Sequence, residues 1–193
     1  MDVAVIGTGS VGGTLGRALA RAGQTVTFGS RHPEDDQVAE ETLGRVTTVE
    51  EALAGADAVI LAIPSTAVSD FTMDNSDSVR GKLVIDATNR MGGTTSNGRA
   101  ELPNTIRYAR AFNTTAVENM ANPVFEEGRA DMFFSSTDED RTTVEKLIEG
   151  VGLRPIFVGV DEEDLVDSLF FLWLDLAIKQ GRGRRLAFHL LQG

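Results

Sequence analysis

Blocks of apolar residues alternate with polar blocks along the chain, and the spacing within the blocks predicts strands and helices in turn. Residues 3–6 are a short apolar run of strand-forming side chains, and the apolar positions in residues 15–20 follow helical spacing. Residues 25–28 predict a second strand, and residues 45–47 predict a short third strand. This alternation is typical of α/β proteins with a parallel sheet.

Two apolar runs further along the chain predict strands that are buried on both faces of such a sheet. Residues 57–63 form a continuous run that stops at Pro64, and residues 82–86 form the next run. Strands that helices cover on both faces have this composition. Three later segments also predict strands, namely 105–112, 130–135 and 154–159.

Helix signals lie between and after these strands. Thr48 and Glu51 have the spacing of a capping box for a helix that ends near residue 56. Residues 116–128 predict a short helix and a turn, and residues 138–150 predict an amphipathic helix.

Residues 162–180 predict the longest helix of the chain. Its apolar positions cover too broad a surface for a single buried stripe on a monomer. We therefore expect this helix to pack on the sheet and also on another partner, such as a second subunit. Gly181 and Gly183 break the helix, and residues 186–191 predict a last helical turn or two.

A glycine-rich turn joins the first strand to the first helix, and it consists of Gly7, Thr8, Gly9, Ser10, Val11 and Gly12. In this pattern, the first glycine permits a tight turn, the second lets the backbone approach a pyrophosphate, and the third lets the helix pack on the sheet. The free N–H groups and positive dipole end of the helix favour phosphates. We interpret the segment as a dinucleotide-binding unit; a glycine-rich turn in another α/β protein is the alternative.

The end of the second strand distinguishes between NAD and NADP. Units that bind NAD carry a carboxylate there for the ribose 2′-hydroxyl, whereas this strand ends in Ser30 and Arg31, and the acidic residues 34–36 follow only after Pro33. An arginine and a hydroxyl bind the 2′-phosphate of NADP, which a carboxylate would repel. We therefore predict NADP, with a solvated loop arginine as the alternative for Arg31. His32 either packs on the adenine or points into solvent.

The carboxyl ends of the later strands are expected to face the cofactor, because ligands of these sheets lie outside that edge. The predicted cofactor contacts are Ala62, Ile63 and Pro64 after one strand, and Ala87 and Asn89 after the next.

The strand at 105–112 is followed by Asn113 and Thr114. Asn113 is a candidate contact of the nicotinamide carboxamide or of a substrate carbonyl, although asparagine is also a common turn residue. We expect Pro64, Asn113 and Thr114 to orient the reacting rings. Residues 91–104 are rich in small polar side chains and predict either a mobile loop over the site or an ordinary surface excursion.

Chain length and composition agree with this outline. The 193 residues suffice for one α/β domain and a small appendage. We predict a Rossmann-type, doubly wound, mostly parallel sheet with a short helical carboxyl-terminal appendage. The predicted division is an NADP-binding domain at 1–160 and a helical segment at 161–193 that contributes to the acceptor site and to a dimer contact.

Charge and cysteine content exclude several kinds of site. The formal net charge of −11 argues against binding to nucleic acid, which needs basic patches. The absence of cysteine excludes disulfides and thiolate ligands, and the two histidines lie too far apart in sequence to indicate a metal site. No apolar stretch is long enough for a membrane span, and the chain begins with its first strand rather than a signal peptide. We expect a cytoplasmic protein without membrane partners.

Side chains that transfer protons in common dehydrogenases are missing from the expected places. Tyr108 is the only tyrosine and has Phe112, not lysine, four residues later, which excludes the Tyr-x-x-x-Lys arrangement. Neither His32 nor His189 follows a strand that ends beside the nicotinamide. Hydride transfer between a nicotinamide and a flavin-like ring needs mainly proximity and orientation, so this pattern favours such a reaction.

The chain resembles the NADPH-dependent coenzyme F420 reductase family over nearly its whole length, in residues 7–12, 29–31, 62–64, 86–89, 111–114 and the short carboxyl-terminal tail. The resemblance implies that Ser30 and Arg31 hold the 2′-phosphate of NADP. It implies that residues 63–64 and the loop around Asn113 lie by the nicotinamide and by the acceptor ring, a deazaflavin (coenzyme F420) or a flavin. It also implies a homodimer with the carboxyl-terminal helices at the interface.

Two other functions stay open. One is an NADPH-dependent flavin or ferric reductase in which F420 has no part, and the other is a non-catalytic NADP-binding sensor. A late basic cluster either holds a phosphate or the anionic tail of F420, or forms an exposed helix end; it consists of Lys179, Arg182, Arg184 and Arg185.

Overall fold

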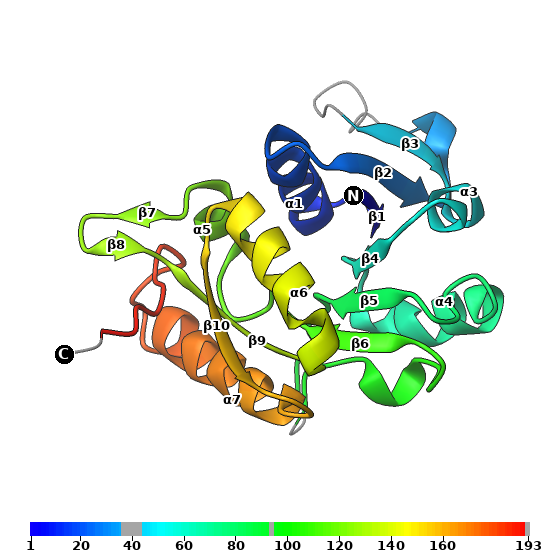
Figure 1. The fold of residues 1–193 in the computed structure, drawn as a ribbon. Helices are drawn as coiled ribbons and strands as arrows, with labels where there is room; N and C mark the ends of the chain where they lie inside the picture. The colour runs from blue at the N-terminus through cyan, green and yellow to red at the C-terminus, as the bar shows by residue number, and fades with distance from the viewer. Residues whose placement is uncertain (36–43, 93–94, 192–193) are drawn as a thin grey trace.

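An eight-stranded sheet carries helices on both of its faces (Figure 1). The computed structural model describes residues 1–35, 44–92 and 95–191. The strands of this sheet are β1 (Asp2–Ile6), β2 (Thr25–Ser30), β3 (Arg45–Thr48), β4 (Ala58–Leu61), β5 (Leu83–Asp86), β6 (Arg107–Arg110), β9 (Asp131–Ser136) and β10 (Arg154–Gly159).

The strands follow the order β10-β9-β6-β5-β4-β1-β2-β3 across the sheet. All neighbours from β3 to β6 pair in parallel, β9 runs antiparallel to β6, and β10 runs parallel to β9. The strand order reverses direction on either side of β1, which creates the switch point where such sheets bind ligands. The predicted fold class, a Rossmann-type and mostly parallel sheet, is confirmed.

Apolar side chains form a separate core on each face of the sheet. One core joins the sheet to α1 (Ser10–Arg21), α5 (Val117–Ala121) and α6 (Asp138–Val151), and the other joins it to α3 (Val49–Ala54) and α4 (Val68–Asn75). All four side chains of β4 are buried, as the continuous apolar run predicted. The Thr48 side chain accepts a hydrogen bond from the Glu51 N–H and caps α3, as the sequence also predicted.

The chain after α5 departs from the prediction in three places. The segment after α5 contains an unpredicted two-stranded hairpin of β7 (Val124–Phe125) and β8 (Gly128–Arg129). The helix predicted at 162–180 is formed by α7 (Glu163–Leu174) and a π-helical segment at Asp175–Lys179, so only the type of its last turn differs from the prediction.

The predicted helical turn at 186–191 is wrong, because this segment has no regular secondary structure and bonds to Asp131 at the start of β9. The Asp131 N–H donates to the Phe188 carbonyl, and the Leu190 N–H donates to the Asp131 carboxylate. The Trp173 indole N–H donates to the Leu186 carbonyl over 2.7 Å. These partners satisfy the backbone groups that a helical turn would otherwise satisfy internally.

The segment after residue 160 packs closely against the rest of the protein. Helix α7 contacts β6 and β9, and the tail runs back beside the β7–β8 hairpin (Figure 1). The proposed division at residue 160 stays a prediction. None of the helices formed by the described residues has the length and hydrophobicity needed to cross a lipid bilayer.

Candidate functional site

The turn between β1 and α1 has two positions where only glycine fits. Gly7 has φ +104°, and a Cβ atom there would lie 2.6 Å from the Ala62 carbonyl oxygen. A Cβ atom on Gly12 would lie 1.9 Å from the Gly7 carbonyl oxygen. The neighbouring atoms are backbone, so no side-chain rotation relieves either clash. Ala62 and Ile63 are therefore the residues after β4 against which the glycine turn packs.

The third glycine of the turn faces open space. A Cβ atom on Gly9 would meet nothing within 4 Å. Gly9 is the N-cap residue of α1, and no side chain accepts a hydrogen bond from the first N–H groups there. No acidic side chain lies in the first turn of the helix. The first N–H groups of α1 are therefore available to an anion, which the helix dipole also favours. Ser10 is exposed beside this space, whereas Val11 packs on the core.

The end of β2 lies beside this turn. The Gly7 N–H donates to the Gly29 carbonyl over 3.1 Å. In the next residues, the Ser30 hydroxyl accepts a hydrogen bond from the His32 N–H over 3.2 Å, while the Arg31 and His32 side chains are exposed. His32 lies 3.8 Å from Glu34. The structure thus brings these predicted residues to the edge of the turn; Asp36 lies outside the described residues.

A cleft of about 720 Å³ lies at the carboxyl ends of β4 and β5, and its lining residues are Pro64, Ser65, Thr66, Ser69, Asn89, Arg90, Met91 and Glu101. Pro64 and Asn89, which the sequence placed on the cofactor side, therefore share one cleft. Its ionisable residues, Arg90 and Glu101, form an ion pair with each other. Ala87 is buried in the core, and its predicted contact with the cofactor stays a prediction.

Asn113 is fully buried, and neither atom of its side-chain amide has a partner among the described residues. Phe112 before it has φ +65°, which is rare for a residue other than glycine. The Phe112 N–H and the Thr114 hydroxyl both donate to the Met132 sulfur, over 3.2 and 3.4 Å. Unpaired buried amides and strained backbone are costly and concentrate at functional sites, so Asn113 stays a candidate cofactor contact.

A buried ion cluster next to the cleft was missed by the sequence analysis. It consists of Asp86 at the end of β5, Arg110 at the end of β6 and Asp167 on α7, all fully buried. Arg110 lies 2.8 Å from Asp167 and 3.3 Å from Asp86, and it also donates to the Asp86 and Thr88 carbonyls. The available signal was a charged residue within or at the end of each of three predicted apolar segments, but other charged residues lie in the same segments.

The same two carboxylates hold the loop that follows β5. Asp167 accepts hydrogen bonds from the Ser96 and Asn97 N–H groups over 2.6 and 3.0 Å, and Asp86 accepts one from the Gly98 N–H over 2.7 Å. This part of the predicted 91–104 loop is therefore bound to the protein rather than free above the site; residues 93–94 lie outside the described residues.

Tyr108 points into this cluster and not into the cleft. Its hydroxyl donates to Asp86 over 2.9 Å. Burial and the neighbouring Asp86 carboxylate raise the pKa of Tyr108 well above its ordinary value of 10.0. The only tyrosine of the chain therefore stays protonated and is already engaged as a donor.

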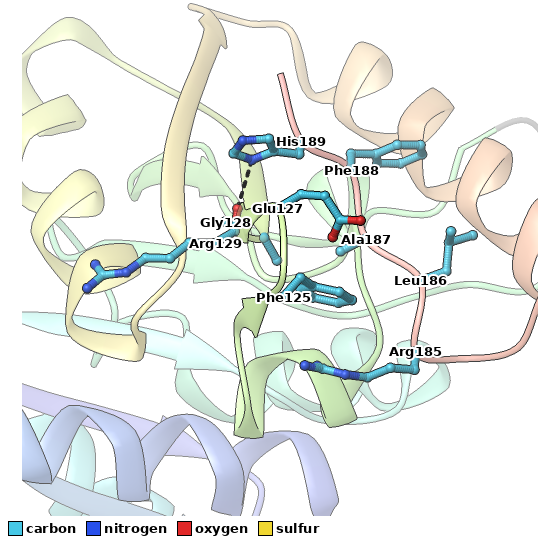
Figure 2. A pocket seen from close by; sticks show the side chains of 10 residues that line it. Phe125, Glu127, Gly128, Arg129, Arg185, Leu186, Ala187, Phe188 and His189 are labelled. Carbon is cyan, nitrogen blue, oxygen red and sulfur yellow. Dashed lines mark hydrogen bonds between the residues drawn. The ribbon is translucent and has the colours of Figure 1, made fainter. Parts of the chain in front are cut away.

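Most of the late basic cluster is occupied within the protein. Arg184 pairs with Glu118 over 2.7 Å, and Lys179 lies 3.4 Å from Asp175. Arg185 lies over the Phe125 ring at 4.0 Å and donates to the Asn119 side chain. Figure 2 shows Arg185 at one end of a pocket of about 300 Å³ between the hairpin and the tail, with His189 at the other end. These contacts fasten the tail and leave Arg182 as the cation of the cluster without a partner among the described residues.

A family model matches the amino-terminal part of the chain, slightly less than half of its length. Residues 2–90 match the model of a family described as NADP oxidoreductase, coenzyme F420-dependent. This segment carries the domain of that family. The resemblance noted from the sequence is confirmed for these residues, and the domain is of the NADP-dependent oxidoreductase type. It includes the glycine turn, Ser30, Arg31, Pro64 and Asn89, whereas Asn113 and the partners of the ion cluster on β6 and α7 lie beyond it.

One curated relative is a glycerol-3-phosphate dehydrogenase [NAD(P)+] of Chlorobium limicola, which is 33% identical over an alignment of 102 residues; the match covers 45% of this chain and 31% of that protein. The chain spans about a third of the length of this relative.

Solved structures share the fold of the F420-dependent family domain and of the segment after it. A provisionally assigned F420-dependent NADP reductase from Arthrobacter sp. FB24 superimposes with a TM-score of 0.84 and 23% identity, and all of both chains is covered. An imine reductase of Streptomyces aurantiacus superimposes with a TM-score of 0.69 and 17% identity over 94% of this chain and 68% of that one. At these identities the likeness establishes the fold.

Proposed function

We propose that the protein transfers hydride between NADP(H) and a deazaflavin, coenzyme F420, or a flavin. The observation that carries the proposal is the uncapped amino terminus of α1 beneath the open space at Gly9. A pyrophosphate in that space accepts hydrogen bonds from the first N–H groups of the helix. Gly7 and Gly12, where a side chain would clash with the backbone, allow the turn to adopt the shape that keeps this space open.

The other end of the site supports NADP rather than NAD. From the turn, the adenosine half of the cofactor extends toward the end of β2, where Ser30 and Arg31 bind its 2′-phosphate. The Arg31 guanidinium is exposed, and such a group forms charge-assisted hydrogen bonds with phosphate oxygens. His32 lies beside them and contacts the adenine or solvent.

The nicotinamide half extends toward the cleft at the ends of β4 and β5. Pro64 and Asn89 line this cleft, and Asn113 follows the neighbouring β6. In this proposal, these side chains orient the nicotinamide, and the second ring stacks on it in the remaining space.

The ionisable groups of the cleft support a ring acceptor. Reduction of a carbonyl group to an alcohol needs a proton donor beside the hydride acceptor. Arg90 and Glu101 pair with each other, and the Tyr108 hydroxyl is bonded to Asp86. A flavin or deazaflavin ring carries its own acceptor atoms and needs chiefly stacking and orientation.

An activity screen tests the proposal. The purified protein is mixed with NADPH and, in separate reactions, with F420, FMN, FAD or a ferric chelate, and the nicotinamide absorbance is followed. Turnover with F420 or a flavin is the expected result. Turnover with the ferric chelate alone supports the ferric reductase, and tight NADP binding without any turnover supports the sensor; both outcomes contradict the proposed reaction.

We also propose that the protein forms a homodimer through α7. Leu165 and Leu172 on α7, and Ile178 after it, are 46%, 48% and 49% exposed, which leaves apolar side chains of one segment in water. Light scattering after size exclusion tests this proposal: a dimer mass is expected, and a monomer mass that does not change with concentration contradicts it.

A further inference from the structure

The buried ion cluster determines how the Asn89 amide is turned in the cleft. Asn89 Oδ1 lies 3.2 Å from the Ser96 hydroxyl and 3.5 Å from Nη2 of Arg110. A guanidinium group has only N–H donors and cannot accept. The Asn89 atom that faces Arg110 must therefore be the oxygen.

The Ser96 hydroxyl agrees with this orientation. Its oxygen accepts a hydrogen bond from the Arg90 N–H over 3.1 Å, so its hydrogen is left to donate to Asn89 Oδ1. With both neighbouring donors on the oxygen side, the NH2 group of Asn89 lies on the opposite side of the amide. No atom of the described residues accepts from it, and Asn89 lines the cleft.

One carboxylate on α7 holds both donors in place. Asp167 Oδ1 accepts from Nε of Arg110 over 2.9 Å, and Asp167 Oδ2 accepts from the Ser96 N–H over 2.6 Å. Asp167 is fully buried and lies 71 residues from Ser96 along the chain. It does not line the cleft, so any effect that it has there passes through Arg110, Ser96 and Asn89.

We infer that Asp167 is a positioning residue that, through Arg110 and Ser96, turns the Asn89 NH2 group into the cleft to donate a hydrogen bond to the nicotinamide carboxamide oxygen. This inference rests on the proposed function, because it needs the nicotinamide in the cleft. It assigns to α7 an indirect part in cofactor geometry, through Arg110, Ser96 and Asn89.

The first experiment reverses the polarity of the cleft-facing atom. In Asn89→Asp, one oxygen still accepts from Arg110 and Ser96, while the other presents a negative charge where the NH2 group was. Calorimetry measures the Kd of NADP and of 2′,5′-ADP, which has no nicotinamide. We expect NADP binding to weaken about tenfold to a hundredfold, 2′,5′-ADP binding to stay unchanged and the melting temperature not to fall. Asn104→Asp, which adds the same charge at an exposed position, is the control.

The second experiment separates positioning from stability. Asp167→Asn keeps the size of the side chain but replaces one carboxylate oxygen, which accepts hydrogen bonds from Arg110 or from the loop N–H groups, with an NH2 group that cannot accept. The control is Asp164→Asn, which changes an exposed residue of the same helix. Positioning predicts that Asp167→Asn raises the ratio of the NADP Kd to the 2′,5′-ADP Kd several-fold. A purely structural role lowers the melting temperature and leaves this ratio unchanged.

Three results are decisive. If Asn89→Asp leaves the NADP Kd unchanged while the wild type binds NADP, the inference is overturned and the proposed function stands. If Asn89→Asp raises only the KM of the flavin or F420, the hydrogen bond goes to the acceptor ring, and the assignment to the carboxamide is overturned. If the wild-type protein binds neither NADP nor 2′,5′-ADP, the proposed function and the inference are both overturned.

Discussion

The two halves of the site are built in different ways. The glycine turn at the end of β1 offers backbone N–H groups from consecutive residues, and its shape depends on the absence of side chains at Gly7 and Gly12. The ion cluster at the ends of β5 and β6 consists of side chains, and its closest pair, Arg110 and Asp167, joins residues 57 positions apart. The first half uses backbone groups of consecutive residues that pack against Ala62, whereas the second brings together side chains that are far apart along the chain.

Because of this difference, the two halves should respond differently to amino-acid substitutions. A turn made of backbone is insensitive to side-chain chemistry but intolerant of added volume. A buried ion cluster tolerates little change of charge, because each partner left unpaired in the interior carries a large desolvation penalty. Substitutions in the two halves should therefore have different consequences for binding and for stability.

Gly12→Ala is expected to abolish NADP binding, with a rise in Kd of more than about a hundredfold, and to lower the melting temperature. The new methyl group would lie 1.9 Å from the Gly7 carbonyl oxygen, so the turn and α1 must separate. Calorimetry and thermal melting measure the two effects.

Gly9→Ala is the matched control for this substitution. Its backbone angles of −65° and −173° suit an alanine, and the added Cβ meets open space, so the melting temperature should not fall. NADP binding should still weaken, since the methyl group occupies space next to the pyrophosphate. Wild-type affinity in this variant would place the pyrophosphate elsewhere.

Arg110→Met is expected to lower the free energy of unfolding by about 3–5 kcal/mol, because Asp86 and Asp167 then lose their buried counter-charge. Urea denaturation measures this change. In the control Arg80→Met, an exposed pair with Asp77 is lost, and the expected change is below about 1 kcal/mol. Equal effects in the two variants would refute the importance of the cluster for stability.

Arg31→Ala is expected to weaken NADP binding by about one to two orders of magnitude, from the loss of charge-assisted hydrogen bonds of roughly 1.5–3 kcal/mol. NAD binding should hardly change, since NAD lacks the 2′-phosphate. Arg45→Ala, at an exposed position on the neighbouring β3, is the control in the same titration. Equal losses for NAD and NADP would refute the 2′-phosphate assignment.

Tyr108→Phe is expected to have the smallest effect, and one that depends on pH. Since the pKa of Tyr108 is raised in the folded protein, the stability that this group contributes is complete below pH 10 and is lost as the pH rises above the unfolded value. The slope approaches about 1.4 kcal/mol per pH unit. The stability advantage of the wild type over Tyr108→Phe should therefore shrink above pH 10, whereas a constant difference would contradict this account.

Particular residues explain how far the sequence could predict the structure. The glycine turn, the doubly buried β4 and the Thr48 cap depend on neighbours within a few positions, and the structure has each of them where the sequence indicated. The tail at 186–191 was predicted as helix because its local apolar pattern allows one. Its backbone instead bonds to Asp131, Asn119 and Trp173, and no local pattern reveals such distant partners.

The sequence by itself determined the alternation of strands and helices, the glycine turn and the place of Arg31 after β2, because each follows from residues that lie close together along the chain. Only the tertiary structure decided that Asp86, Arg110 and Asp167 form one buried cluster and that this cluster turns Asn89 toward the cleft. The physical reason is that a buried charge requires a partner, and the partner is selected by packing in space rather than by position along the chain.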